Sequence, residues 1–190
     1  MNNEELIQKI YEWADARNLI KGSNPVDQGM KILSELGELA VRGLARKNEK
    51  EVKDGIGDVA VVMTVIAGQV GLVDHVKGIV ANLPNKPENS GVDTLTNTKQ
   101  KVLVLTQFIV QSIMAVDTDQ KEAFKHNFLP IIFSVLAVMA SEENFTFNEC
   151  LAQAYNDIKD RTGILWNGVF VKSTDPTYAE AVKAVAEQNK

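Results

Sequence analysis

The 190-residue chain has little cysteine, no excess of positive charge and no long apolar run. Its single cysteine, Cys150, excludes an internal disulfide framework and is typical of a reducing compartment. A net charge of -5 argues against broad non-specific binding to nucleic acid. Met1 to Lys9 is too polar for a signal peptide, and no apolar run reaches the ~18 residues of a membrane span. We therefore expect a cytoplasmic protein with neither nucleic acid nor membrane as a partner.

Sustained strand-type alternation is also absent, whereas apolar residues recur at helical spacing along most of the chain. Leu83 to Asp93 is rich in proline and polar residues and reads as a linker, and Arg161 to Lys172 reads as an irregular tail. In the first half, the expected helices run from the Asn2 or Asn3 cap to Lys21-Gly22, from Pro25 to about Arg46, and from Glu49 to Gln69 or Gly71. In the second half, they run from Asp93 or Thr94 to Val116, from about Asp119 onward, from Phe147 to Asp160, and from Asp175-Pro176 to the end. Pro130 either starts a new helix or kinks one.

These patterns predict an all-α fold. We treat residues 1–190 as a single domain whose first half is 1–83. A second half with the C-terminal segment follows at 93–172, and a terminal helix at 173–190.

Four carboxylates fall on two successive predicted helices. Glu35 and Glu38 share one helix face, as do Asp54 and Asp58, because residues three or four apart lie on the same side. The short link between the helices folds them back, and the neighbours of these acids are apolar. Carboxylates in such surroundings must be paired, protonated or bound to a cation. Oxygen ligands of this kind suit Mg2+, with Mn2+ as an alternative ion.

Two glycines, Gly55 and Gly57, interrupt the second acidic helix. Each weakens a helix by up to ~1 kcal/mol relative to alanine. Two explanations account for them equally well. Either a ligand must approach the backbone closely, or another helix packs against it.

The sequence matches itself at an offset of 70 residues. Residues 61–67 (VVMTVIA) fall on residues 131–137 (IIFSVLA) without a gap. The four acids, however, fall on large apolar residues, namely Leu105, Phe108, Phe124 and Phe128. One interpretation is a duplicated helical pair in which only the first copy keeps a metal site. The other is a coincidence of two amphipathic hairpins, and Pro130 opposite Ala60 counts against strict equivalence.

The arrangement Gln28, Lys31, Glu35-Leu-Gly-Glu38 followed by Asp54-Gly-Ile-Gly-Asp58 resembles the MazG-like family of all-α nucleoside triphosphate pyrophosphohydrolases, whose signature is ExxE, a spacer and ExxD. Residues 154–172 are similar to the C-terminal segment of phage-type members. The resemblance covers residues 4–72 and about 148–172. It implies a MazG-like helical bundle in which two tandem hairpin repeats form a pseudo-dimer, and a homodimer of such chains.

The resemblance also implies the activity, which is Mg2+-dependent hydrolysis of a nucleoside triphosphate to a monophosphate and pyrophosphate. Glu35, Glu38 and Asp58 would be the catalytic carboxylates that hold the metal. Gly55 stands where the family has a glutamate, so either Asp54 substitutes as a metal ligand or the site has three acidic ligands. The residues implied to contact the substrate are Trp13, Gln28, Lys31, Asn156, Lys159, Arg161 and Lys172.

Two other functions remain open. A catalytically silent relative would bind nucleotide without turnover, and Gly55 favours this alternative. A helical oligomerisation or adaptor module would use the acids in interface salt bridges. Without the resemblance, Glu35 and Glu38 read as a solvated helix face, and Lys159 and Arg161 as charges that complement a helix C-terminus.

Overall fold

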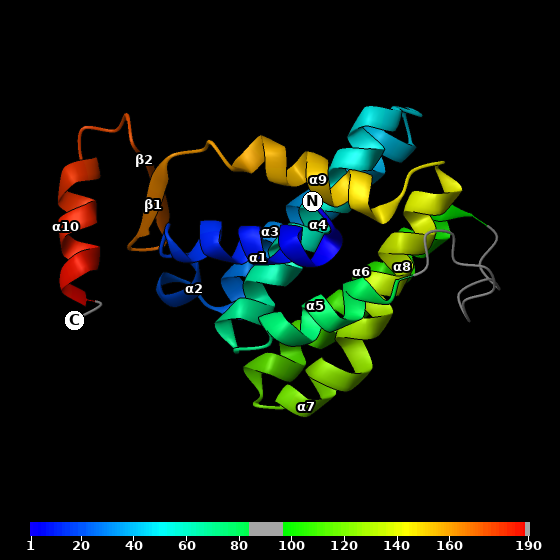
Figure 1. Ribbon diagram of the computed structural model, residues 1–190, viewed down its shortest axis with the longest axis horizontal. Coiled ribbons are helices and arrows are strands. Elements are labelled where there is room, and N and C mark those ends of the chain that lie inside the picture. The colour runs from blue at the N-terminus through cyan, green and yellow to red at the C-terminus, as the bar shows by residue number, and fades with distance from the viewer. Residues whose placement is uncertain (84–96, 189–190) are drawn as a thin grey trace.

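The computed structural model describes residues 1–83 and 97–188 (Figure 1). Apart from one short hairpin, this part of the chain is helical, which confirms the predicted all-α class. The helices are α1 (Asn3–Asp15), α2 (Leu19–Gly22), α3 (Pro25–Glu38) with the π-helical turn η1 (Leu39–Leu44), α4 (Glu49–Gln69), α5 (Val73–Ala81), α6 (Thr98–Asp117), α7 (Lys121–Ala123), the π-helical turn η2 (Phe124–Phe128), α8 (Leu129–Glu142), α9 (Phe147–Ile158) and α10 (Tyr178–Gln188). The hairpin consists of β1 (Gly163–Trp166) and β2 (Val169–Lys172).

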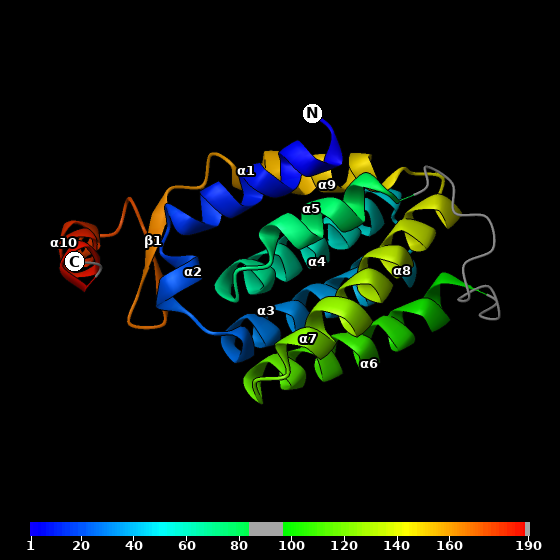
Figure 2. The same ribbon diagram turned by 60° about the horizontal axis from the view of Figure 1, so that its bottom comes forward.

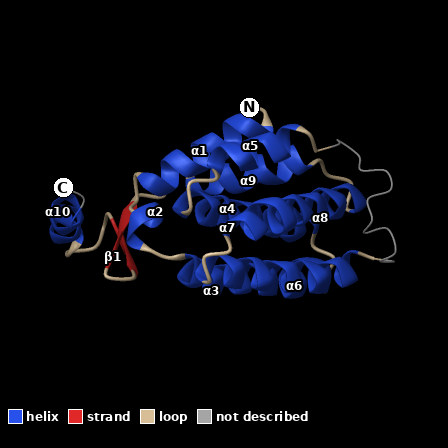
Figure 3. Ribbon diagram, turned by 90° about the horizontal axis from the view of Figure 1, so that it is seen from below, coloured by secondary structure: helices blue, strands red, loops and turns tan. Residues whose placement is uncertain are grey.

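The helices stack in three layers (Figure 3). α3 and α6 form the lowest layer in that view, α4 and α8 the middle layer, and α1, α5 and α9 the upper layer (Figures 2 and 3). α4 contacts α3, α8, α1 and α9. Every residue from Val59 to Gly68 is buried. α4 is therefore the central helix, which explains why its sequence is apolar nearly all round.

Polar residues begin the helices where the sequence predicts them. Each of five caps accepts a hydrogen bond through its side chain from a backbone N–H three residues later, and these caps are Asn2, Asn24, Asn48, Asn97 and Thr146. Such a cap satisfies one of the N–H groups left without a partner at the helix start. The predicted starts of the first three long helices are thereby confirmed.

Close helix packing explains the two glycines of α4. A Cβ atom on Gly55 would lie 2.8 Å from the Leu39 Cβ, and one on Gly57 would lie 2.7 Å from the Ala154 Cβ. The added Cβ at Gly57 would also collide with the backbone carbonyl of Cys150 on α9. α4 therefore lies so close to η1 and α9 that neither position has room for a side chain. The alternative explanation, a ligand at the helix backbone, is not needed.

The tail predicted to be irregular is a two-stranded antiparallel hairpin, so that prediction is wrong. Ile164 pairs with Val171, and the turn is Asn167-Gly168, whose φ angles are 51° and 76°. Asn-Gly between two apolar runs is a strong hairpin signal because both turn residues must have positive φ. The strands are too short for the alternation on which the prediction relied. α10 packs on this hairpin through Ala181 and Val185, and together they form a second small core.

The first helix is shorter than predicted. α1 ends at Asp15, and Asn18 adopts a left-handed conformation with φ 59° before α2 begins. The Asn18 side-chain amide donates a hydrogen bond of 3.0 Å to the carbonyl of Leu165 on β1. A contact 147 residues away thus holds the break, and local periodicity cannot reveal it.

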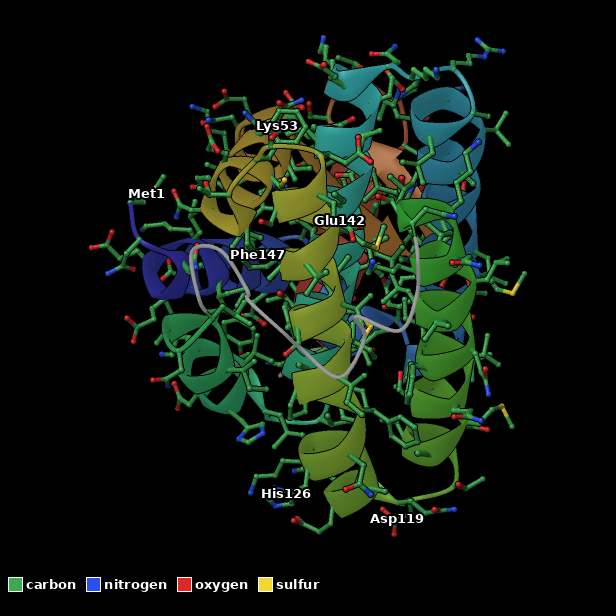
Figure 4. The ribbon with its side chains drawn as sticks, turned by 90° about the vertical axis from the view of Figure 1, so that its right-hand side faces the viewer. Met1, Lys53, Asp119, His126, Glu142 and Phe147 are labelled. Atoms are coloured by element: carbon green, nitrogen blue, oxygen red, sulfur yellow. The ribbon has the colours of Figure 1, made fainter. Side chains whose placement is uncertain are left out.

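Three further predictions concern the middle of the chain. α5 fills a stretch for which no helix is predicted. The predicted linker, apart from Leu83, and the predicted helix start at Asp93 or Thr94 lie outside the described residues, and α6 begins at Thr98. Pro130 is the second residue of α8, so it starts a helix rather than kinking one. Figure 4 shows α6 and α8 joined by the turn at Asp119.

One stretch of the described chain, Lys121–Glu142, is long and apolar enough by composition to cross a membrane, with a mean hydropathy of 1.5 over its most apolar window. Buried residues make up 56% of that window. Ile132, Phe133 and Leu136 of α8 are 0% exposed and belong to the main core. The stretch thus packs as a core helix of the bundle.

Candidate functional site

A cavity of about 440 Å³ lies at the end of the bundle where the hairpin meets α2. This volume is within the range of small-molecule sites. Segments from both ends of the chain enclose it, and its lining residues are Trp13, Leu19, Ser23, Asp27, Gln28, Lys31, Glu35, Asp58, Val61, Val62, Val65, Ile158, Arg161, Leu165, Gly168 and Phe170. Its wall is mostly apolar, with two carboxylates of the predicted metal set and several of the predicted substrate contacts.

Glu35 and Lys31 form one polar side of this cavity. Glu35 is 7% exposed, and its Oε1 lies 2.5 Å from the Lys31 Nζ, one helical turn away. The Lys31 side chain is 59% exposed. A nearly buried carboxylate is therefore compensated by a cation that also faces solvent.

Asp58 projects from the central helix into the same cavity. The pKa of its carboxyl is raised to about 7. Burial is the largest cause, and the charges of Asp54 and Glu35 add to it. Arg161 and Lys31 act in the opposite direction. Burial and the neighbouring negative charges thus outweigh the two cations and favour the protonated form of the Asp58 carboxyl.

Asp54 does not line the cavity, but its charge acts on Asp58, which does. Burial raises the pKa of Asp54 to about 6, with further contributions from Asp157 on α9 and from Glu51, while Gln153 lowers it. The Asp54 Oδ1 is buried and has no hydrogen-bond partner among the described residues. An unpaired buried oxygen on a carboxylate is a costly arrangement that a bound cation would relieve.

Asp157 was not among the predicted site residues. It lies one position after Asn156, and the sequence shows only that it shares a helix face with Gln153. The close approach of α4 and α9 at Gly57 brings Asp157 beside Asp54. Only tertiary packing makes this pair.

Glu38 does not line the cavity, unlike Glu35 and Asp58. It is exposed, and its Oε2 accepts a hydrogen bond of 3.0 Å from the Arg42 Nη1. Within residues 1–83 and 97–188, no group of three or more histidine, cysteine, aspartate or glutamate side chains is arranged to hold a metal ion. The role of Glu38 as a metal ligand therefore stays a prediction.

Four of the seven predicted substrate contacts line the cavity, namely Trp13, Gln28, Lys31 and Arg161. Lys172 lines an adjacent cavity of about 520 Å³, which shares Arg161 and Phe170 with the first. Asn156 and Lys159 are exposed near the end of α9 and line neither of the two cavities. Phe170, Ser23 and Asp27 also line the main cavity and were not predicted, because the hairpin and the cap of α3 were not expected to meet.

Trp13 is oriented by Arg17, another residue that sequence analysis missed. The Arg17 guanidinium lies 4.9 Å from the centre of a Trp13 ring, and its Nε donates to the carbonyl of Arg161 at 2.7 Å. The Trp13 Nε1 is buried and has no hydrogen-bond partner in the described chain. One ring face is therefore covered by a cation, and an N–H donor remains unused beside the cavity.

Hydrogen bonds connect α2, α3 and α4 beside this cavity. The Ser23 hydroxyl accepts hydrogen bonds from the amides of Gln28 at 2.9 Å and Gln69 at 2.8 Å, and it donates to the carbonyl of Leu19. The predicted contact residue Gln28 is thus held in place by a side chain from the preceding loop.

Comparison with known proteins gives one informative match. No family model matches the chain, and no solved structure matches it. The chain is 31% identical over 114 residues to the uncharacterized 18.2 kDa protein in the rep-hol intergenic region of Haemophilus phage HP1. The match covers 59% of this chain and 67% of the phage protein. The chain therefore belongs to the same family as this phage protein.

Proposed function

We propose that the protein is a Mg2+-dependent nucleoside triphosphate pyrophosphohydrolase of the MazG-like type. The observation that carries this proposal is the cavity in which Glu35 and Asp58 meet the cations Lys31 and Arg161. A triphosphate needs both kinds of group, because cations must hold its oxygens while carboxylates hold the metal that accompanies it.

Glu35, Asp58 and Asp54 are the residues that would hold a divalent cation. Glu35 and Asp58 supply hard oxygen donors, and Asp54 adds an oxygen that has no partner in the described chain. The pKa of Asp58 and that of Asp54 are both raised, first by burial and then by neighbouring carboxylates. When bound, Mg2+ neutralises triphosphate charge and lowers the pKa of water at the site.

The other lining residues suggest how the substrate lies. Lys31 and Arg161 would hold the phosphate oxygens, and the exposed fraction of Lys31 leaves it free to reach them. Trp13 would contact the base, with its unused N–H as a donor. Water would attack the α-phosphorus, and one of the carboxylates would accept the proton of that water. The bond between the α-phosphorus and the oxygen that bridges it to the β-phosphate would break, and pyrophosphate would leave with that oxygen.

We also propose that α3–α4 and α6–α8 are tandem repeats that form a pseudo-dimer. Support comes from the self-match of the sequence at an offset of 70 residues. The turns between the paired helices are of one kind, which also ends α4 at Gly71 and α8 at Asn144. Lys47 and Asp119 both have positive φ, and in each turn the next residue donates to a carbonyl five residues earlier, Asn48 to Gly43 at 3.0 Å and Gln120 to Ala115 at 2.7 Å. Both hairpins thus reverse through the same kind of helix C-terminal motif.

Release of pyrophosphate from a panel of canonical and modified nucleoside triphosphates tests the function. The assay would use Mg2+, Mn2+ and EDTA, with the Asp58→Asn variant and an exposed matched control, Asp117→Asn. We expect metal-dependent release by the wild type and by the control, and a loss of at least ~100-fold in the Asp58→Asn variant.

Other outcomes would select another function. Nucleotide binding without release on any substrate would identify a silent relative, which the absence of a carboxylate at Gly55 favours. If the protein neither releases pyrophosphate nor binds nucleotide, the remaining function is a helical interaction module.

A further inference from the structure

The main cavity is enclosed by segments from opposite ends of the chain. Trp13 comes from α1, whereas Arg161 and Phe170 come from the segment that follows α9. The end of α1 lies beside β1 (Figures 1 and 2). Arg17, which does not line the cavity, contacts both walls. It therefore connects the two segments at the place where they meet.

The guanidinium group of Arg17 donates through all three of its nitrogens to backbone carbonyls. Its Nε donates to Arg161 at 2.7 Å, its Nη1 to Trp13 at 3.0 Å and its Nη2 to Lys159 at 3.5 Å. The backbone carbonyl of Arg17 in turn accepts a hydrogen bond of 2.8 Å from the N–H of Leu165 on β1. A planar fork with fixed donor directions can hold three carbonyls in one arrangement, whereas the single ammonium nitrogen of a lysine cannot.

The carbonyls of Lys159 and Arg161 belong to the chain just after α9. Because α9 ends at Ile158, these carbonyls lie beyond the hydrogen bonds of the helix. Arg17 supplies their partners and so fixes the course of the backbone that carries Arg161. The Arg161 side chain is held as well, since its Nε donates to the carbonyl of Asp157 at 3.0 Å. The position from which Arg161 reaches the cavity is thus fixed.

On the other wall, Arg17 holds Trp13. The guanidinium carbon lies 4.9 Å from the centre of a Trp13 ring, and this contact covers one face of the ring. In the part of the chain that the structure describes, Arg17 forms no salt bridge. Its carbonyl and ring contacts therefore account for its placement.

We propose that Arg17 is a positioning residue for the nucleotide, because it holds Trp13 and Arg161 at the spacing from which both can contact one bound molecule. This inference rests on the proposed function. The carboxylates of Glu35 and Asp58 lie on α3 and α4, whereas the Arg17 side chain contacts α1 and the segment after α9. Loss of Arg17 should therefore weaken substrate binding and leave the chemical step at the α-phosphorus largely intact.

The rate of pyrophosphate release at varied substrate concentration separates KM from kcat. The substrate is the nucleoside triphosphate of the panel that the wild type hydrolyses fastest. Arg17→Met keeps an apolar stem, and Arg17→Lys keeps the charge without the fork. We expect each to raise KM at least ~10-fold and to change kcat less than ~3-fold. The matched control is Arg46→Met, at an exposed position between η1 and α4, which should leave both constants unchanged.

A second measurement needs no substrate. The chain has two tryptophans, so Trp166→Phe leaves Trp13 as the sole emitter of tryptophan fluorescence. In that background, Arg17→Met should raise the acrylamide quenching constant of Trp13 about two-fold, because it uncovers a ring face. Arg46→Met should leave this constant unchanged. Circular dichroism should show the same helix content in all variants.

Three results would overturn the inference. One is an unchanged KM in Arg17→Met. Another is a wild-type KM in Arg17→Lys, which would mean that the charge alone suffices. The third is unchanged quenching of Trp13 in Arg17→Met.

Failure of the proposed function would be recognised separately. A wild type that releases no pyrophosphate contradicts that function, and the role of Arg17 is then decided by the quenching of Trp13 and by equilibrium binding of the same triphosphates. Weaker binding and stronger quenching in Arg17→Met would support the positioning role. A wild type that binds no nucleotide would overturn both proposals.

Discussion

The helical hairpins α3–α4 and α6–α8 differ in the residues at their inner positions. In the first, α3–α4, the carboxylates of Glu35 and Asp58 line a cavity. In the second, α6–α8, the residues 70 positions after Glu35 and Asp54 are Leu105 and Phe124, which are both 0% exposed. The comparison teaches that a hairpin can hold either a polar site or a filled core, depending on whether its inner residues are acids or large apolar groups.

The lysines of the two hairpins differ in the same way. Lys31 is 59% exposed and pairs with Glu35 on its own helix. Lys101, 70 positions later, is 1% exposed and forms a salt bridge with Glu142 on α8. The Thr98 hydroxyl also hydrogen-bonds with Glu142 and Glu143. The first lysine can therefore reach a ligand, whereas the second is part of a structural ion pair.

The largest effect should come from placing an acid in the second hairpin. We expect Leu105→Glu to lower the free energy of unfolding by more than ~4 kcal/mol, because it removes a buried apolar side chain and buries an unpaired carboxylate. Urea denaturation measures this. If the variant does not fold, Leu105→Ala should still show a loss of about 2–5 kcal/mol. Lys99→Glu, exposed on the same helix, is the control, and a similar loss there would contradict the explanation.

Removing an acid from the first hairpin should stabilise the protein. The pKa of Asp58 is raised to about 7 from its ordinary 3.8, so the folded state keeps a proton that the unfolded chain releases. The free energy of unfolding of the wild type therefore falls as pH rises between these two values. In EDTA, Asp58→Asn should be about 2–4 kcal/mol more stable than the wild type near pH 8, and the difference should vanish near pH 4.

Urea denaturation at a series of pH values measures this difference. If the free energy of unfolding of the variant has the same pH dependence as that of the wild type, Asp58 is not the carboxyl whose pKa folding raises.

A divalent cation should offset the cost of burying the Asp58 carboxylate. We expect saturating Mg2+ to raise the free energy of unfolding of the wild type by about 1–3 kcal/mol, since the ion binds the folded state alone. Thermal unfolding with and without EDTA measures the gain. Asp117→Asn should keep the gain and Asp58→Asn should lose it. Equal gains in both variants would place the ion elsewhere.

The smallest effect should come from Glu38. Its ion pair with Arg42 is exposed, so Glu38→Gln should change the free energy of unfolding by less than ~0.5 kcal/mol. Pyrophosphate release then distinguishes two roles. A loss of turnover as large as in Asp58→Asn would include Glu38 in the metal site. Unchanged turnover would mean that its role is limited to the Arg42 pair.

Much of the fold follows from local patterns in the sequence. The Asn24-Pro25 pair and the Asn48 cap determine where α3 and α4 begin, because a cap satisfies its own helix end without distant help. The spacing of Glu35 and Asp58 within their apolar helices likewise predicts that both face inward. The hairpin at Asn167-Gly168 was also readable, since its turn signal is local, but the strands are too short for an alternation test.

The tertiary structure alone decided the rest. The Asn18 break depends on a hydrogen bond to Leu165, and the Asp54–Asp157 pair depends on how closely α9 packs on α4 at Gly57. Glu38 shares a helix face with Glu35 in the sequence, yet it pairs with Arg42 in solvent. The physical reason is that local patterns specify the backbone and the buried side of each helix. Which polar groups meet depends on distances between helices, and these distances are set by the packing of all of them together.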